Sequence, residues 1–420
     1  MAPPWVILGR VLRAGPGLDA VDAGAEHAAA MEAEEGAQAE EHVAAMDVDV
    51  DAEPQAQAEN AAAEPDFTVP VELPPRVAVL AAGRGAHPDA DKPDKYPYII
   101  AAGRFCLLAH FAVAPSHGTC FDHDPQNTHL VLVRFGHTAD GGTMALAEHV
   151  PRRTRFVPAL WNVGSVGLLS DNERLTIAEL RVHQGSDRAT LVSFESKLAA
   201  LHPSGWSSTD VACPLPAEDR DREWVPHGTV SISGSSICWF DLSWGMLICD
   251  HVQTRPSFNF HRLPGGRALA KATPDIHNRR CITVTMEIKR CNAVNKLRYV
   301  EIIAPEGKAA TVTMWTRIIG DRGRWEWEMN YEVSFESIWN DDSYKETSLP
   351  PIVPVLAVVS PSNHEVVYFA LEQHLFGVNV PRCRVVHRAA YDPVNIQGRP
   401  PQPASGRYLV PWNPSQSVAH

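Results

Sequence analysis

The residues with the clearest metal-binding chemistry lie in one short segment, SHGTCFDHDPQNTH. His117, Cys120 and His123 follow one another at three-residue spacing, and Asp124 and His129 come after them. Imidazole and thiolate are ligands that zinc prefers, and a turn can bring side chains at this spacing together. Structural zinc sites usually take their ligands as two close pairs, however, and no second pair is evident. One interpretation is therefore a zinc site, and the other is a polar loop between strands in a chain with 19 histidines.

Catalytic motifs are missing from the sequence. It contains no G-x-S-x-G, no H-E-x-x-H, no P-loop pattern and no G-x-G-x-x-G after a strand. An acidic group at Glu336, Asp341, Asp342 and Glu346 could supply paired carboxylates for acid and base catalysis. Such a group more often caps a short helix and faces solvent. We therefore predict no catalytic residue and no cofactor.

The negative charge of the chain is concentrated in one segment. The net charge is −13, but residues 14–75 contain sixteen acidic residues and no lysine or arginine. The rest of the chain is close to neutral, so the overall charge argues for neither a nucleic-acid partner nor an acidic surface. Residues 14–66 are rich in Ala and Glu and poor in aromatic and branched apolar residues. We predict that this acidic segment is disordered, because little apolar surface offsets the entropy of ordering it.

Several features bear on the compartment. The eight cysteines form no C-x-x-C pair, and the sequence has no N-glycosylation acceptor with a permitted middle residue. The apolar core of the first residues is too short for a signal peptide. No apolar run approaches the roughly 20 residues of a membrane helix. By elimination we expect a protein of the cytoplasm or nucleus, neither secreted nor membrane-spanning.

From Phe67 onward the sequence changes to short apolar runs separated by Pro, Gly, Asn and Asp. Two stretches match when one is placed over the other: SICWFDL, SWG and MLICD at residues 236–250, and EVVYFAL, EQH and LFGVNV at residues 365–380. A third apolar run follows each of them. The repeat predicts a three-strand β-meander.

Five or six such units give a period of about 50 residues, the size of a four-stranded propeller blade. We predict an all-β, propeller-like array of five or six meander blades, with a two-sheet sandwich as the competing fold and one helix at residues 335–344. We also expect Trp239, Trp244, Trp315, Trp325 and Trp327 to pack between the sheets. The predicted organisation comprises an N-terminal segment with a possible strand at residues 1–13, the acidic segment at 14–66, the propeller at 67–396 and a flexible Pro-rich tail at 397–420.

Four stretches resemble a family of plant proteins that is expanded in grasses and called domain of unknown function 1618: WVILGRV, GSDRATLVSF, WFDLSWGMLICD, and the long run from YEVSF to FGVNV. The resemblance covers residues 5–11 and 67–391. It implies a likeness to the kelch-like, F-box-associated propellers of plants. It implies no catalytic or ligand-binding residue. The Leu- and Pro-patterned helices of an F-box are absent, so we do not expect a direct role as a ubiquitin-ligase adaptor.

Two functions are compatible with this sequence. The first is a non-enzymatic module that binds a protein partner through the loops of the propeller, with the acidic segment available to a basic partner. The second is a small-ligand-binding or hydrolytic propeller that uses its central funnel. An apolar plug in the funnel would favour the first function, and charged side chains converging on one point would favour the second. We expect neither a membrane nor a nucleic-acid partner, because Arg279, Arg280, Lys289 and Arg290 are not interleaved with exposed aromatic residues.

Overall fold

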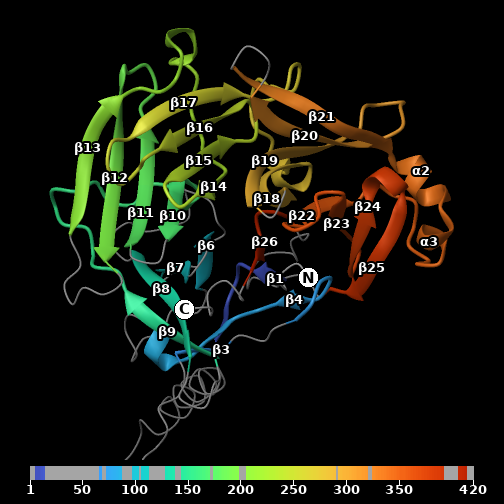
Figure 1. Cartoon of the computed structure of the whole chain (residues 1–420), viewed down its shortest axis with the longest axis horizontal. Coiled ribbons are helices and arrows are strands. Elements are labelled where there is room, and N and C mark those ends of the chain that lie inside the picture. The colour runs from blue at the N-terminus through green and yellow to red at the C-terminus, as the bar shows by residue number, and fades with distance from the viewer. Residues whose placement is uncertain are drawn as a thin grey trace, which may run out of the picture.

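The computed structural model describes residues 5–14, 66–68, 72–87, 97–103, 106–112, 128–137, 143–170, 174–197, 205–289, 292–319, 324–391 and 405–413. These residues form six β-sheets arranged around a common axis, which is a six-bladed β-propeller (Figure 1). The prediction of an all-β propeller with five or six blades is confirmed. No helix in these residues is both long enough and apolar enough to cross a membrane.

Five blades are built from consecutive antiparallel strands, four to a blade. Blade 1 contains β6 (Tyr98–Ala102), β7 (Cys106–Ala112), β8 (Thr128–His137) and β9 (Thr143–His149). Blade 2 contains β10 (Val166–Ser170), β11 (Arg174–Val182), β12 (Arg188–Lys197) and β13 (Trp206–Ala212). Blade 3 contains β14 (Gly228–Ser233), β15 (Ser236–Asp241), β16 (Gly245–Asp250) and β17 (Ser257–Arg262). Blade 4 contains β18 (Arg280–Lys289), β19 (Asn292–Ile303), β20 (Thr311–Ile319) and β21 (Trp325–Ser334). Blade 5 contains β22 (Val355–Val359), β23 (Val366–Leu371), β24 (His374–Asn379) and β25 (Arg384–Ala390).

Blade 6 combines strands from opposite ends of the described chain. Strand β26 (Leu409–Trp412) pairs antiparallel with β1 (Val6–Gly9), and β1 pairs parallel with β4 (Val77–Ala78). This pairing closes the ring, and closure protects sheet edges that would otherwise be exposed. Three short strands extend the sheet of blade 1 beyond β9: β3 (Phe67–Thr68), β5 (Ala81–Ala82) and β2 (Arg13–Ala14).

The closing strand corrects one prediction. Residues 405–413 were expected to belong to a flexible tail, but they contain β26, with Tyr408, Leu409 and Trp412 buried. Pro411 is tolerated because β26 pairs with a strand on one side only and its other edge faces the channel. At the other end, β1 lies within residues 1–13, the segment for which a strand was considered. Residues 15–65, which hold most of the acidic segment, lie outside the described part of the chain.

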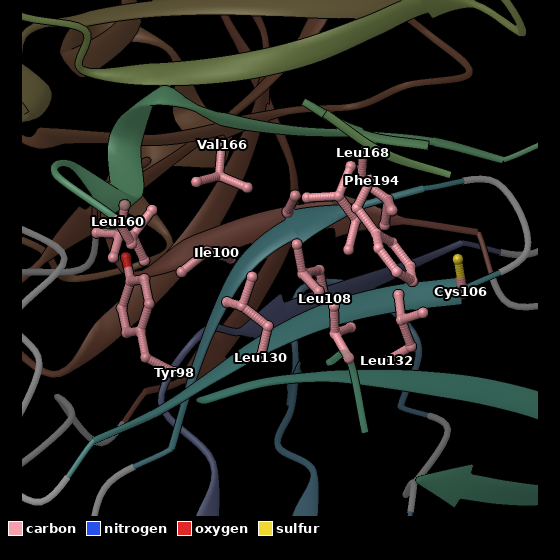
Figure 2. Close-up of a cluster of buried hydrophobic side chains, with 14 of the residues drawn as sticks. Tyr98, Ile100, Cys106, Leu108, Leu130, Leu132, Leu160, Val166, Leu168 and Phe194 are labelled. Atoms are coloured by element: carbon pink, nitrogen blue, oxygen red, sulfur yellow. The ribbon is translucent and has the colours of Figure 1, made fainter. Parts of the chain in front are cut away.

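The hydrophobic core lies between the blades. Each of six clusters of buried side chains draws its members mainly from two neighbouring blades, so that together they follow the whole ring. Figure 2 shows one of them, in which Leu108, Leu130 and Leu132 of blade 1 face Val166, Leu168 and Phe194 of blade 2. Alternate side chains of a strand point to opposite faces of its sheet, so each strand can supply two clusters.

Helices are few and short in the part of the chain that the structure describes. The helix predicted at residues 335–344 is present as α2 (Phe335–Asn340) and α3 (Asp342–Lys345). Asp341 caps α3 by accepting the Ser343 backbone N–H at 2.9 Å, so this part of the acidic group has the capping role. The remaining helical segments are single 3₁₀ turns: η1 (Arg84–Ala86), η3 (Val163–Ser165), η4 (Ala217–Asp219), η5 (Ile276–Asn278) and η6 (Val380–Arg382).

Candidate functional site: the central channel

The first strands of the blades surround the propeller axis. Strands β6, β10, β14, β18, β22 and β26 lie against one another in this order and line a cavity of about 790 Å³. Pockets for small ligands typically measure about 300–1,000 Å³. The channel therefore has the size of a small-molecule site, and it lies where the second sequence-based function would place one.

The side chains lining this channel are neutral or cationic. Hydroxyl groups come from Ser170, Thr229, Ser231, Ser233, Thr283 and Ser362, and amides come from Asn295 and Asn413. Two of the hydroxyls join neighbouring blades, because Thr229 donates to the Val166 carbonyl at 2.9 Å and Ser231 donates to the Leu168 carbonyl at 2.5 Å. The side chains able to carry positive charge are Arg10, Arg280, His227 and His277. No aspartate, glutamate or lysine is found among the described lining residues.

Arg10 follows β1 and joins blade 6 to blade 1. Its Nη1 donates to the carbonyls of Ile99 and Ile100 at 2.9 and 3.1 Å. Its own backbone N–H donates to the Tyr408 carbonyl at 2.8 Å. The Nε atom is buried and has no hydrogen-bond partner, and no described carboxylate lies within ion-pair distance of the guanidinium. A cation held by neutral carbonyls alone leaves the channel with an uncompensated positive charge.

His277 lies on η5, just before blade 4. Burial lowers the pKa of its imidazole well below 6.5, and the charges of His227, Arg407 and Arg10 lower it further. The ring centroids of His277 and His227 are 5.4 Å apart. These groups therefore share one part of the channel, and their mutual repulsion favours the neutral form of His277 at pH 7.

His227 is oriented by blade 3. Its Nδ1 accepts the Leu242 backbone N–H at 3.2 Å and lies 3.4 Å from Asp241 Oδ1. In a neutral ring that accepts at Nδ1, the proton is on Nε2, where it can be donated to a ligand. Burial by itself raises the Asp241 pKa, but the neighbouring His227 ring and the hydrogen bonds from the Ser243 N–H and hydroxyl outweigh burial and hold that pKa below its usual value.

The remaining reactive groups in the channel wall are engaged or inert. Arg280 Nη2 lies 2.6 Å from Glu301 Oε1, and Arg280 Nη1 donates to two backbone carbonyls at 2.8 Å, so its charge is compensated within the wall. Burial raises the pKa of the Cys281 thiol to about 12, and the charge of Arg10 lowers it only in part. A protonated thiol is a poor nucleophile. The arrangement can bind and neutralise an anion, but it presents no activated nucleophile.

The metal-binding residues predicted from sequence are not tested by this structure. His117, Cys120, His123 and Asp124 all lie outside the described residues. His129 is described, and its Nε2 lies 2.8 Å from Arg152 Nη2. Within the described ranges, no three His, Cys, Asp or Glu side chains are placed to hold one metal ion. A zinc site in the segment that follows β7 remains a prediction.

Part of the chain matches a known protein family. Residues 239–368 match a family model described as protein of unknown function (DUF1618). The matched stretch runs from β15 in blade 3 to β23 in blade 5 and includes the DLSWGMLICD and YEVSF segments. The resemblance to this family is therefore confirmed over these residues. The channel residues Arg10 and His227 lie outside the match, whereas His277 lies within it.

Solved structures resemble the chain only in outline. The β-propeller domain of Cps50 (Swd1) from Myceliophteria thermophila is 10% identical, with 69% of this chain and 84% of that chain covered and a TM-score of 0.29. Apo AztD from Citrobacter koseri is 12% identical, with 70% of each chain covered and a TM-score of 0.26. A comparison with curated proteins gave no match. At these levels of similarity, neither structure bears on the function of this chain.

Proposed function

We propose that this protein is a non-catalytic binding module whose central channel receives a small anionic ligand. The two functions compatible with the sequence differ in what they require of the channel. An apolar plug would suit a module that binds only through its outer loops. The channel instead brings Arg10, His227 and His277 together and has no described carboxylate in its lining.

The observation that carries this proposal is the state of the Arg10 guanidinium. It is fixed by the carbonyls of Ile99 and Ile100, its Nε has no partner, and no described acid compensates its charge. An anionic carboxylate, sulfate or phosphate group would supply both the missing acceptor and the missing charge. The Nε2–H of His227 would add a second donor.

The test is anion binding to the full chain. Sulfate, phosphate, citrate and ATP are screened by thermal unfolding, because a ligand that binds only the folded state raises Tm. The tightest ligand is then titrated by calorimetry. We expect Arg10→Gln to weaken binding about 10- to 100-fold, the effect of losing one or two hydrogen bonds to a charged group. Arg10→Lys keeps the positive charge but lacks the planar guanidinium, so this variant is expected to bind the anion with intermediate affinity.

The control is Arg76→Gln, which removes an arginine whose side chain is 72% exposed and paired with Glu72. Its affinity should match that of the wild type. If none of the four anions raises Tm, or if Arg10→Gln binds them as tightly as the wild type, the channel is not an anion site.

Sulfate binding should strengthen as the pH falls below 6.5 toward the pKa of free His277. In the free protein His277 is neutral at the upper end of this range, because its pKa lies well below 6.5. A bound anion favours the imidazolium, so binding takes up a proton, and affinity rises with acidity until the pKa of free His277 is reached. If the anion raises this pKa by one unit, the gain is at most about tenfold.

Sulfate is the suitable probe for this measurement because its own charge stays constant over this pH range. His277→Gln keeps a neutral polar side chain that does not titrate. It should bind sulfate with little pH dependence, as measured by calorimetry at three pH values. A His277→Gln variant with the full pH dependence of the wild type would assign the proton uptake to another group.

A further inference from the structure

A second cavity lies apart from the channel, at the junction of blades 1 and 2. It measures about 500 Å³ and is lined by the loop at residues 150–160, by the start of β8 and by Trp206 of β13. Its apolar lining includes Leu130, Val150 and Leu160, which belong to the buried cluster of Figure 2. No acidic side chain is among the described residues that line it.

Arg153 forms a rigid part of this second cavity. Its side chain is only 8% exposed and forms an ion pair with the fully buried Glu179. The guanidinium also donates to the Pro158 carbonyl at 3.0 Å and lies over the Trp206 ring, 4.4 Å from its centroid. Trp206 is held in turn, since its Nε1 donates to the Pro151 carbonyl at 2.6 Å. Cation–π stacking of this kind fixes both side chains.

The charges at this site do not balance. Glu179 also pairs with Arg181, whose Nε lies 3.0 Å from Glu179 Oε1, so one carboxylate serves two guanidinium groups. The Nη2 atom of Arg153 is buried without a hydrogen-bond partner. Buried donors are nearly always satisfied in folded proteins, so an acceptor from a ligand is the natural partner for this atom.

The rim of the second cavity is basic and aromatic. Arg152 and Arg155 are exposed on the same loop, and Arg155 stacks over Phe156 at 4.8 Å. Phe156 is 78% exposed, and the nearby Trp161 is 41% exposed. Exposed aromatic residues beside arginines are typical of protein interfaces. They lie outside the cavity, which indicates an occupant larger than a small molecule.

We propose that this second cavity binds an acidic peptide segment of a partner protein. One apolar side chain of the peptide enters the cavity against Leu130, Val150 and Leu160. Carboxylates on either side of it pair with Arg152 and Arg155, and an oxygen of the peptide accepts from Arg153 Nη2. The apolar floor favours a peptide over nucleic acid, which would need an extended basic track instead.

The proposal is tested with a fluorescein-labelled peptide, DEDFDED, titrated with the full chain and followed by fluorescence anisotropy. We expect saturable binding, and binding about tenfold or more weaker for DEDADED, because the phenylalanine ring supplies the buried apolar surface. The double variant Arg152→Glu, Arg155→Glu should weaken DEDFDED at least about tenfold through lost pairing and new repulsion. Both side chains are exposed, so the substitutions should leave the fold intact.

The charge-matched control is Arg188→Glu, Arg255→Glu, which reverses two other exposed arginines. The proposal would be overturned if the control variant weakened DEDFDED binding equally, or if DEDFDED and DEDADED bound with equal affinity. Either result would show that binding depends only on general electrostatic attraction. Tighter binding of single-stranded oligothymidylate than of DEDFDED would overturn it in favour of nucleic acid. Loss of DEDFDED binding in the Arg10→Gln variant would place the peptide in the central channel and overturn the proposal.

Discussion

Replacing Asp241 with alanine is expected to lower the free energy of unfolding by about 3–5 kcal/mol, the range found when one partner of a buried charged network is removed. Asp241 is 2% exposed, and its carboxylate accepts from four donors, three in the turn that follows β15 and one at Val225. It accepts the Ser243 N–H at 2.8 Å and hydroxyl at 2.6 Å, the Trp244 Nε1–H at 3.2 Å and the Val225 N–H at 3.2 Å. Alanine would leave these donors unsatisfied in the interior.

Asp241→Asn removes the charge of this carboxylate and keeps the shape of the side chain. The amide fits the same space but presents an NH₂ group to some of the donors, so an intermediate cost of about 1–3 kcal/mol is expected. Asp250→Ala is the matched control, because Asp250 ends the next strand of the same blade and accepts the Ser236 hydroxyl at 2.7 Å. Its loss should cost about 1 kcal/mol. Urea unfolding followed by tryptophan fluorescence measures all three, and equal midpoints for Asp241→Ala and Asp250→Ala would refute the role given to Asp241.

The same carboxylate connects the fold to the channel. Asp241 lies 3.4 Å from His227 Nδ1 and also accepts from Val225, two residues before that histidine. It therefore stabilises the segment that carries His227 into the channel. Asp241→Asn is accordingly expected to reduce anion affinity more than Asp250→Ala does.

The strands of the individual blades could be predicted because the residues that indicate each strand and turn are close together in the sequence. In SICWFDL and MLICD, two β-favouring runs flank a short turn, and β15 and β16 form there as expected. Trp239 and Trp244 are fully buried and Trp315 is 7% exposed, which confirms the expected packing between sheets for these three. Apolar alternation over a few residues was enough to find these strands and the faces that they bury.

The prediction for Trp325 was wrong, because alternation does not reveal where a strand lies within its blade. Trp325 is 48% exposed, and Met329 on the same strand is 54% exposed. Strand β21 is the outermost strand of blade 4, so little covers it. A β-bulge between Met314 and Trp315 also shifts its register, and Asn330 Oδ1 accepts from the buried Thr316 hydroxyl at 2.6 Å.

The channel could not be predicted for a different reason. Arg10, His227 and His277 come from blade 6 and from the segments before blades 3 and 4, and no spacing rule relates them. Ring closure alone brings Arg10 close enough to His277 and Cys281 to lower the pKa of both. Because β26 was not recognised as a strand, the closure that positions Arg10 was also missed. Its strand character depends on pairing with β1 rather than on local propensity.

Because β26 and β1 depend on this pairing, we expect the removal of β26 to have the largest effect on the stability of the fold. A chain ending at residue 404 lacks β26 and should not accumulate as a folded protein, whereas a chain ending at Asn413 keeps β26 and should unfold at the wild-type midpoint. The shorter chain loses three buried side chains, Tyr408, Leu409 and Trp412. At about 1.5–3 kcal/mol each, their burial is comparable to the whole stability of a typical protein, about 5–15 kcal/mol.

Truncation at residue 404 would remove packing contacts outside blade 6 as well. Trp412 packs with the cluster shared by blades 6 and 1, Leu409 with the cluster shared by blades 5 and 6, and Tyr408 with the cluster between blades 1 and 2. The Tyr408 carbonyl also accepts the Arg10 backbone N–H, so Arg10 would lose one of the hydrogen bonds that hold it in the channel. Leu409→Ala is the milder test for a chain that must still fold, with an expected cost of about 2–5 kcal/mol. Soluble yield, circular dichroism and urea midpoints distinguish the outcomes. A chain ending at residue 404 that folds with the midpoint of the chain ending at Asn413 would show that the ring is stable without this closure.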